Sequence, residues 1–146
     1  MEADRLGGCK RIVLILDTNM AIYMAQGLFS ADSILDALGF PYLILVTPPV
    51  LEELRRIASS GRPSEARRAS RALEVLEREG YIEAGEAGER ADDSIVSLAV
   101  KLKSSGCRVV VATSDRELRR RLRSLGVPTL YYRESRGSVE VEWEPI

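Results

Sequence analysis

The chain contains 146 residues, of which 45% are hydrophobic and 29% charged, and its formal net charge is −1. These proportions are ordinary for a soluble globular protein, and the length suits one domain with a sizeable core. The chain has no histidine, which excludes histidine metal ligands, histidine general bases and every catalytic triad built on histidine. Cys9 and Cys107 exclude a cysteine zinc site and a disulfide framework, but they allow one isolated disulfide.

The longest apolar runs span about five or six residues, which is too short to cross a membrane. Charged residues interrupt the first ten positions, so no secretory signal is visible, and the expected compartment is the cytoplasm. We expect residues 1–10 to form a flexible leader and residues 11–146 to form a single domain.

The first part of the domain alternates between apolar runs and helical patterns. Residues 12–16 are a continuous apolar run that ends at Asp17, which predicts a fully buried strand. Residues 18–38 contain two helical stretches, the second of which begins after Ser30. Residues 43–46 form another apolar run and predict a second buried strand.

Helical patterns dominate the middle of the chain. Thr47 is followed by two prolines, which is typical of a capped helix start, and this helix is predicted to run to about Ser59. Residues 64–79 have the pattern of a long amphipathic helix. Residues 81–84 are a candidate for a short strand, and residues 92–103 have the apolar spacing of another helix.

The last third of the chain contains three more strand candidates. Residues 108–112 and 127–132 predict buried strands, and residues 139–143 alternate as an edge strand does. Ser114 and Glu117 have the spacing of a capping box, which predicts a helix between the first two strands. This alternation predicts an α/β fold: a three-layer α/β/α sandwich around a central, mostly parallel sheet of about five strands.

Four segments deliver acidic side chains to the predicted carboxyl edge of this sheet, which is where open α/β sheets bind ligands. The acids are Asp17, Glu52, Glu53, Asp92, Asp93 and Asp115. Carboxylates without basic partners repel one another, and Mg²⁺ or Mn²⁺ bound through oxygen relieves that repulsion. Two such ions about 4 Å apart can activate a water and stabilise the leaving oxygen of a phosphodiester.

Each polar residue of this edge also has a purely structural interpretation. The alternatives are helix capping for Asp17, Asp92 and Asp93, a favourable helix dipole for Asp115, and solvent exposure for Glu52 and Glu53. Because Ser114 is the predicted cap of its helix, Asp115 is not needed for capping. Asn19 and Thr113 are expected to orient the acids or contact a phosphate, with turn formation and strand propensity as their alternatives.

Four motifs, taken in order, resemble those of the PIN-domain ribonucleases. They are Asp17-Thr18-Asn19, Val50-Leu51-Glu52-Glu53-Leu54, Ala91-Asp92-Asp93-Ser94-Ile95-Val96 and Ala112-Thr113-Ser114-Asp115-Arg116-Glu117-Leu118. The resemblance covers about residues 11–133. It implies a parallel α/β/α sandwich and an endoribonuclease that depends on Mg²⁺ or Mn²⁺ and hydrolyses RNA phosphodiester bonds by in-line attack of water.

The resemblance also assigns roles to individual residues. The family's four catalytic, metal-binding acids match Asp17, Glu53, Asp93 and Asp115, with Asp92 as an additional candidate metal ligand. Residues 115–133 look more like the stand-alone ribosome-biogenesis branch of archaea and eukaryotes than like bacterial toxins, which implies rRNA processing and a ribosomal precursor particle as partner. Homodimers are common in the family.

Residues 116–136 contain seven arginines and two glutamates. Arg116, Arg119, Arg120 and Arg123 share one helical face by their three- and four-residue spacing. An arginine face beside the acids suits an RNA backbone, and a solvated amphipathic helix explains the same pattern. Residues 74–93, with eight acids and two arginines, could instead pair with this face across two copies of the chain.

Three other functions are compatible with parts of the pattern. A toxin-type ribonuclease of a toxin–antitoxin pair would share the four acids, and a non-catalytic RNA-binding ribosome-assembly factor would share the fold. A phospho-acceptor signalling domain would need a second acid after the first strand and a lysine after the last, where Tyr131-Tyr132-Arg133 stands instead. The sequence contains no glycine-rich nucleotide-binding motif.

Overall fold

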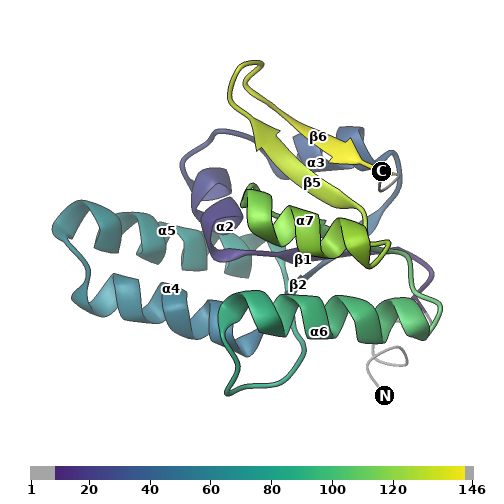
Figure 1. Ribbon diagram of the computed structural model, residues 1–146. Helices are drawn as coiled ribbons and strands as arrows, with labels where there is room; N and C mark the ends of the chain where they lie inside the picture. The colour runs from purple at the N-terminus through teal and green to yellow at the C-terminus, as the bar shows by residue number, and fades with distance from the viewer. Residues whose placement is uncertain (1–8, 144–146) are drawn as a thin grey trace.

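A six-stranded sheet of order β3-β2-β1-β4-β5-β6 forms the centre of the computed structural model, which describes residues 9–143 (Figure 1). The strands are β1 (Ile12–Leu16), β2 (Tyr42–Val46), β3 (Ile82–Glu83), β4 (Val109–Ala112), β5 (Thr129–Arg133) and β6 (Ser138–Glu142). The first five are parallel, and only β6 runs antiparallel to its neighbour. The predicted α/β fold is confirmed, and the two-residue β3 brings the sheet to six strands rather than about five.

The helices that connect these strands are α2 (Thr18–Ala25), α3 (Ala31–Leu38), α4 (Pro48–Ser60), α5 (Pro63–Glu79), α6 (Ala91–Ser104) and α7 (Arg116–Ser124). α5 packs against α2 and α4, and α6 packs against both α4 and α7. The strand order shows that the chain moves outward from β1 to β3 and then returns to the other side of β1 for β4, β5 and β6. Among the described residues, no helix combines the length and the apolar character needed to span a bilayer.

The two central strands are buried along their whole length. Every residue of β1 and β4 is buried, as the uninterrupted apolar runs predict for parallel strands covered on both faces. Leu14 and Val110, which are register partners in these strands, are each no more than 1% exposed. The sheet therefore forms a rigid base on which the segments that follow β1 and β4 are positioned.

Helix starts show where the sequence patterns hold and where tertiary contacts replace them. Ser30 caps α3 as predicted, and its hydroxyl accepts the Ser33 backbone N–H at 3.1 Å. Thr47 begins α4 but makes no capping hydrogen bond with its side chain. Its hydroxyl instead accepts a hydrogen bond from Ser94 at 2.9 Å, and both residues are buried. This bond fixes the start of α6 against the start of α4.

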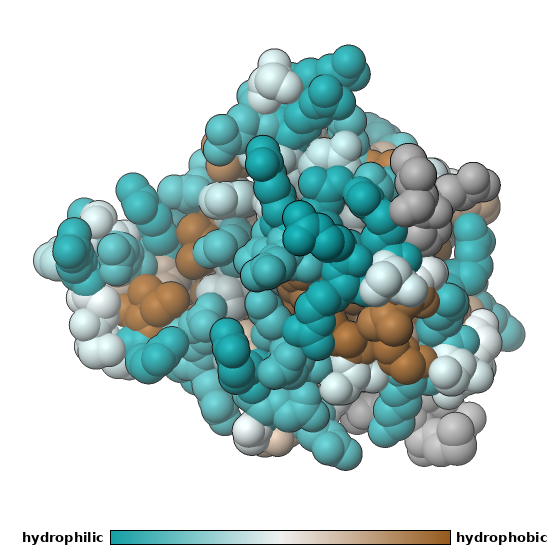
Figure 2. Space-filling view, in the orientation of Figure 1, coloured by the Kyte–Doolittle hydropathy of each residue, from teal (hydrophilic) through white to brown (hydrophobic). Residues whose placement is uncertain are grey.

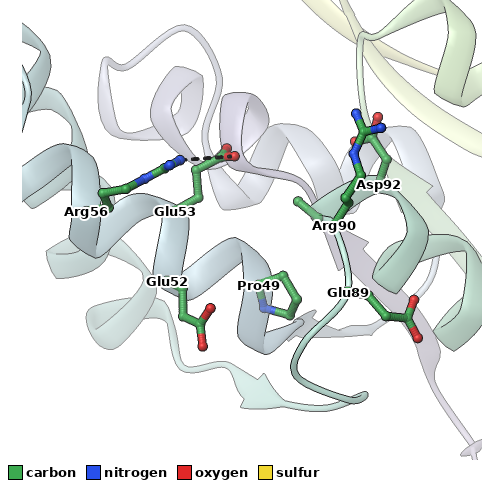
Figure 3. Close-up of a pocket in the computed structure, with 8 residues that line it drawn as sticks. Pro49, Glu52, Glu53, Arg56, Glu89, Arg90 and Asp92 are labelled. Atoms are coloured by element: carbon green, nitrogen blue, oxygen red, sulfur yellow. Dashed lines mark ion pairs between the residues drawn. The ribbon is translucent and has the colours of Figure 1, made fainter.

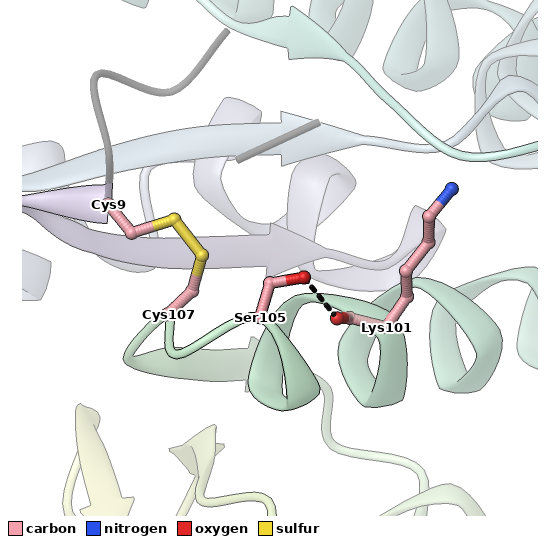
Figure 4. Close-up of a disulfide and its surroundings, with 4 residues drawn as sticks. All are labelled: Cys9, Lys101, Ser105 and Cys107. Carbon is pink, nitrogen blue, oxygen red and sulfur yellow. Dashed lines mark hydrogen bonds between the residues drawn. A yellow bond between two sulfur atoms is a disulfide. The ribbon is translucent and has the colours of Figure 1, made fainter. Parts of the chain in front are cut away.

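A disulfide joins Cys9, just before β1, to Cys107, just before β4 (Figure 4). The sequence allowed this disulfide but did not require it. In the structure the disulfide lies at the amino ends of the two central strands. Most of the predicted leader, residues 1–8, lies outside the described residues. Its ninth residue is tied covalently to the core of the sheet.

We expect loss of this bridge to lower the free energy of unfolding by about 2–5 kcal/mol, because it closes a long loop in the unfolded chain. The two cysteines are 98 residues apart in sequence. Urea unfolding of the oxidised protein, the dithiothreitol-reduced protein and the Cys9→Ser variant measures this difference. Reduced protein and variant should unfold at the same, lower urea concentration, and reductant should leave the variant unchanged. Identical midpoints for the oxidised and reduced wild type would contradict the expectation.

Candidate active site

The carboxyl ends of β1 and β4 bring two polar segments together. Leu16 and Ala112 are register partners in the parallel sheet, so Asp17 and Thr113, which follow them, leave the sheet side by side. The Asp17 backbone N–H donates to the Ala112 carbonyl at 3.1 Å. Four helices follow the carboxyl ends of parallel strands: α2 follows β1, α4 follows β2, α6 follows β3 and α7 follows β4. Their N-termini therefore gather at this edge of the sheet (Figure 1).

Asp17 is the most deeply placed acid of this edge, with 8% of its surface exposed. Its Oδ1 accepts the Met20 backbone N–H at 2.8 Å and so caps α2. Burial raises the pKa of Asp17 from 3.8 to about 6, against the lowering effect of hydrogen bonds from Thr113 and Met20. The charges of Asp92 and Asp115 raise this pKa further. Asp17 is therefore a carboxylate whose ionised form the protein alone stabilises poorly.

Asp115, not Ser114, is the cap of α7, and the predicted capping box is wrong. Asp115 Oδ1 accepts the backbone N–H groups of Glu117 at 2.8 Å and Leu118 at 3.0 Å. The Ser114 hydroxyl instead accepts the Tyr132 backbone N–H at 3.0 Å. Strand pairing with β5 thus continues past the end of β4, and the helix starts later than the local pattern predicts.

Thr113 connects the two capping acids. Its side chain is fully buried, its hydroxyl bonds the Asp17 carboxylate, and the same oxygen accepts the Asp115 backbone N–H at 3.2 Å. The orienting role of Thr113 stays a prediction. Asn19 lies in the first turn of α2 and is exposed to solvent.

The acidic pair at the start of α6 divides between two environments. The pKa of Asp92 is raised by partial burial and by the charge of Asp115, while Arg90 and Arg121 oppose this shift. Asp93 Oδ1 accepts a hydrogen bond from Arg121 Nη1 at 2.9 Å. The match of Asp93 with the third acid of the family motif stays a prediction. In the structure, the charge of Asp92 contributes to the raised pKa of Asp17, and the charge of Asp115 contributes to the raised pKa values of both Asp17 and Asp92.

Glu53 reaches the same region from α4. It lines a pocket of about 700 Å³ whose other lining residues are Pro49, Glu52, Arg56, Glu89, Arg90, Ala91 and Asp92. Figure 3 shows Glu53 and Asp92 on opposite sides of this pocket, with the Arg90 side chain alongside Asp92. Glu53 Oε2 lies 3.9 Å from Arg56 Nη2, a distance at which two exposed groups attract only weakly.

Within residues 9–143, no group of three or more Asp, Glu, Cys or His side chains is arranged closely enough to hold a metal ion. The four acids predicted to share a metal ion are therefore not close enough to one another in this structure to do so. The donor chemistry nevertheless fits Mg²⁺ or Mn²⁺, because the acids supply only oxygen, and Asp17 and Asp92 both have pKa values raised partly by neighbouring carboxylates.

The arginines of α7 do not form one surface. Arg123 holds Glu142 of β6 through three hydrogen bonds of 2.7–2.9 Å. Arg119 lies 3.5 Å from the same carboxylate, and its guanidinium stacks 3.7 Å from the centre of the Tyr131 ring. These two side chains fasten α7 to the β5–β6 hairpin. In the described part of the chain, no carboxylate forms an ion pair with Arg116 or Arg120.

Comparison with known proteins decides the family. Residues 14–135 match the family described as "PIN like domain". The chain belongs to this PIN-like family. A protein named Ribonuclease VapC9 from Archaeoglobus fulgidus is 32% identical over 136 residues, which cover 93% of this chain and 94% of that protein.

Two further relatives and one solved structure extend the comparison. Ribonuclease VapC3 from Aeropyrum pernix is 38% identical, over 77% of this PIN-like chain and 88% of its own length. Ribonuclease VapC4 from Methanocaldococcus jannaschii is 25% identical, over 84% and 92%. The solved PIN domain endonuclease Utp24 superposes with a TM-score of 0.70 and 23% identity, covering 92% of this chain and 95% of that one. This last likeness establishes the fold.

Two arginines of the PIN site were missed by the sequence analysis. Arg90 lies two residues before Asp92, the first acid of the α6 pair, and Arg121 reaches the pair from α7. The position of Arg90 beside Asp92 and Asp93 was a usable signal. The Arg121 contact depends on how α6 and α7 pack, which no local pattern reports.

We expect Asp17→Asn to stabilise the protein at about pH 8 by about 1–3 kcal/mol and to change little at about pH 4. Because the pKa of Asp17 is raised in the folded state, to about 6, the folded protein holds a proton that the unfolded chain has lost. Its contribution to stability therefore falls as pH rises from about 4 to about 6 and stays unfavourable above that window. Asparagine keeps the capping oxygen and removes the charge.

Urea unfolding of wild type and variant at the two pH values measures this effect. The exposed Asp36 on α3 provides the control, because Asp36→Asn removes one negative charge without relieving a buried carboxylate. An Asp17→Asn protein that is less stable than wild type at about pH 8 would show that burial of this charge carries no penalty.

Proposed function

We propose that this PIN-like protein is a metal-dependent endoribonuclease of the VapC toxin type. One observation carries the proposal: Asp17, Asp92 and Asp115 come from three separate segments and interact unfavourably at one sheet edge. Helix capping or solvent exposure would explain each acid singly, but neither role requires the three acids to lie at the same edge of the sheet. Mutual repulsion of this kind is relieved by a divalent cation with oxygen ligands.

Asp17, Asp92 and Asp115 are the side chains that would hold Mg²⁺ or Mn²⁺, with Glu53 reaching in from α4. When bound, one or two ions would supply activation of a water and stabilisation of the leaving oxygen of a phosphodiester. We assign Asp93, whose carboxylate pairs with Arg121, to positioning at the rim of the site.

The remaining polar residues prepare the site. Thr113 holds the Asp17 carboxylate and the start of α7 in fixed relation, so that the acids keep their positions when RNA binds. Asn19, exposed in the first turn of α2, is placed to bond an RNA oxygen or a water. Arg116 and Arg120 supply positive charge on α7 beside Asp115, where an RNA phosphate would approach.

The relatives favour a toxin-type ribonuclease over an rRNA-processing enzyme. Three sequence relatives are named VapC ribonucleases, whereas Utp24, at 23% identity, supports the fold alone. RNA is the proposed substrate. An antitoxin protein would then be the natural partner, and a homodimer and a ribosomal precursor particle stay predictions of the family resemblance.

RNA cleavage with Mn²⁺, with Mg²⁺ and with a chelator tests the proposal. We expect cleavage only with metal. Asp92→Asn should lower kcat on the order of 100- to 1,000-fold, because the Asp92 carboxylate would hold the ion that stabilises the reacting phosphate. Asp93→Asn should retain activity to within about tenfold, because it removes one partly exposed ion pair.

The matched pair of adjacent asparagine variants separates site chemistry from folding. Both substitutions remove one charge from the first turn of α6, so a shared loss would indicate damage to the helix start. Cleavage in chelator, or full activity of Asp92→Asn, would reject the metal-dependent reaction. RNA binding that requires metal but yields no product would identify the assembly-factor alternative.

A further inference from the structure

A second arginine group lies outside the site already described. A pocket of about 550 Å³ opens between the end of α2 and the start of α5. Its lining residues are Ala25, Gln26, Ser64, Arg67, Arg68 and Arg71. The lining thus combines three cations with an amide and a hydroxyl, and the only apolar member is a single alanine.

These three arginines form no ion pair with the described residues. Arg67, Arg68 and Arg71 are exposed, and no carboxylate within residues 9–143 forms an ion pair with any of them. They occupy neighbouring positions on one helix, where like charges at three- and four-residue spacing repel. The contrast is Arg123 on α7, whose charge is taken up by Glu142. The arginines of α5 are therefore arranged for a negative partner from outside the chain.

α2 connects this pocket to the acidic edge. Asp17 caps the start of α2 and Gln26 caps its end. The helix has eight residues and is about 12 Å long. The pocket thus lies about one short helix away from Asp17, at the opposite end of α2, and its arginines belong to α5, which packs on α2.

We propose that Arg67, Arg68 and Arg71 bind the phosphate backbone of the RNA substrate a few nucleotides from the bond that is cleaved. This inference rests on the proposed ribonuclease function and extends it by adding a second contact surface. Guanidinium forks match phosphate oxygens, and contacts of this kind fix the register of a strand without reading its sequence. A polymer with regularly spaced negative charges can reach the acids and this pocket at once, which a single small anion cannot.

The test compares two triple variants with the same change in net charge, both in an Asp17→Asn background that retains the cap of α2. Arg67→Gln/Arg68→Gln/Arg71→Gln removes the pocket cations, and Arg11→Gln/Arg78→Gln/Arg136→Gln removes three exposed arginines elsewhere. Fluorescence anisotropy with a short labelled single-stranded RNA measures affinity over a range of salt concentrations.

We expect the pocket variant to lose on the order of 10- to 100-fold in affinity and the control to stay within about threefold. The slope of log affinity against log salt should become shallower by about 0.7 per lost phosphate contact, so by about 2 for three contacts. With Asp17 restored, the pocket variant should raise KM for RNA cleavage and leave kcat unchanged. Equal losses in both triple variants, or an unchanged slope in the pocket variant, would overturn the proposal.

A poly-glutamate peptide provides the competing probe. If the pocket variant loses affinity for this peptide and keeps its affinity for RNA, the arginines serve an acidic protein partner and the RNA assignment is wrong. The anisotropy assay measures RNA binding independently of cleavage. If the wild-type protein binds RNA through this pocket but does not cleave it, the proposed ribonuclease function is wrong and the proposed RNA contact still holds.

Discussion

The repulsion among carboxylates at one edge of the sheet is the constraint on which the functional interpretation depends. Asp17 is buried, and the charges of Asp92 and Asp115 add to the cost of ionising it. Part of that cost is offset because each of these acids lies at a helix N-terminus, where backbone N–H groups and the helix dipole favour negative charge. The fold thus brings the acids to one edge with their charges only partly offset, and the proposed function assigns a divalent cation as their complement.

Capping and catalysis are usually weighed as alternatives, but here they are compatible in the same side chains. Asp115 uses Oδ1 for both backbone N–H groups of its cap, and Asp17 likewise bonds Met20 through Oδ1. A carboxylate has a second oxygen, which can serve a metal or a water while the first fixes the orientation of the group. A helix cap is therefore a way to hold a reactive carboxylate still, because the geometry of the helix end determines where its second oxygen lies.

The sequence predicted the sheet better than the details of the site, for physical reasons. Buried parallel strands need continuous apolar runs, so β1 and the position of Asp17 after it could be located from the sequence alone. Asp92 and Asp93 are separated by about 100° of rotation around one helix, and the Arg121 side chain that bonds Asp93 comes from another element, so the sequence could not distinguish their surroundings. The partner of Arg119 and Arg123 is likewise Glu142, a residue of an edge strand whose contact with α7 exists only in the folded chain.

An acidic edge repels RNA as well as itself, so the attraction that brings a polyanion to it has to come from elsewhere on the surface. The chain as a whole cannot supply it, since its net charge is −1 (Figure 2 shows hydrophilic residues covering most of one face). What matters is which arginines lack internal partners, because a guanidinium already bound to a carboxylate has little attraction left for phosphate. By that criterion Arg123 belongs to the scaffold, whereas the α5 arginines are available. If RNA binds as proposed, the acids of the fold determine its path indirectly, because an arginine that pairs with an internal carboxylate no longer belongs to the binding surface.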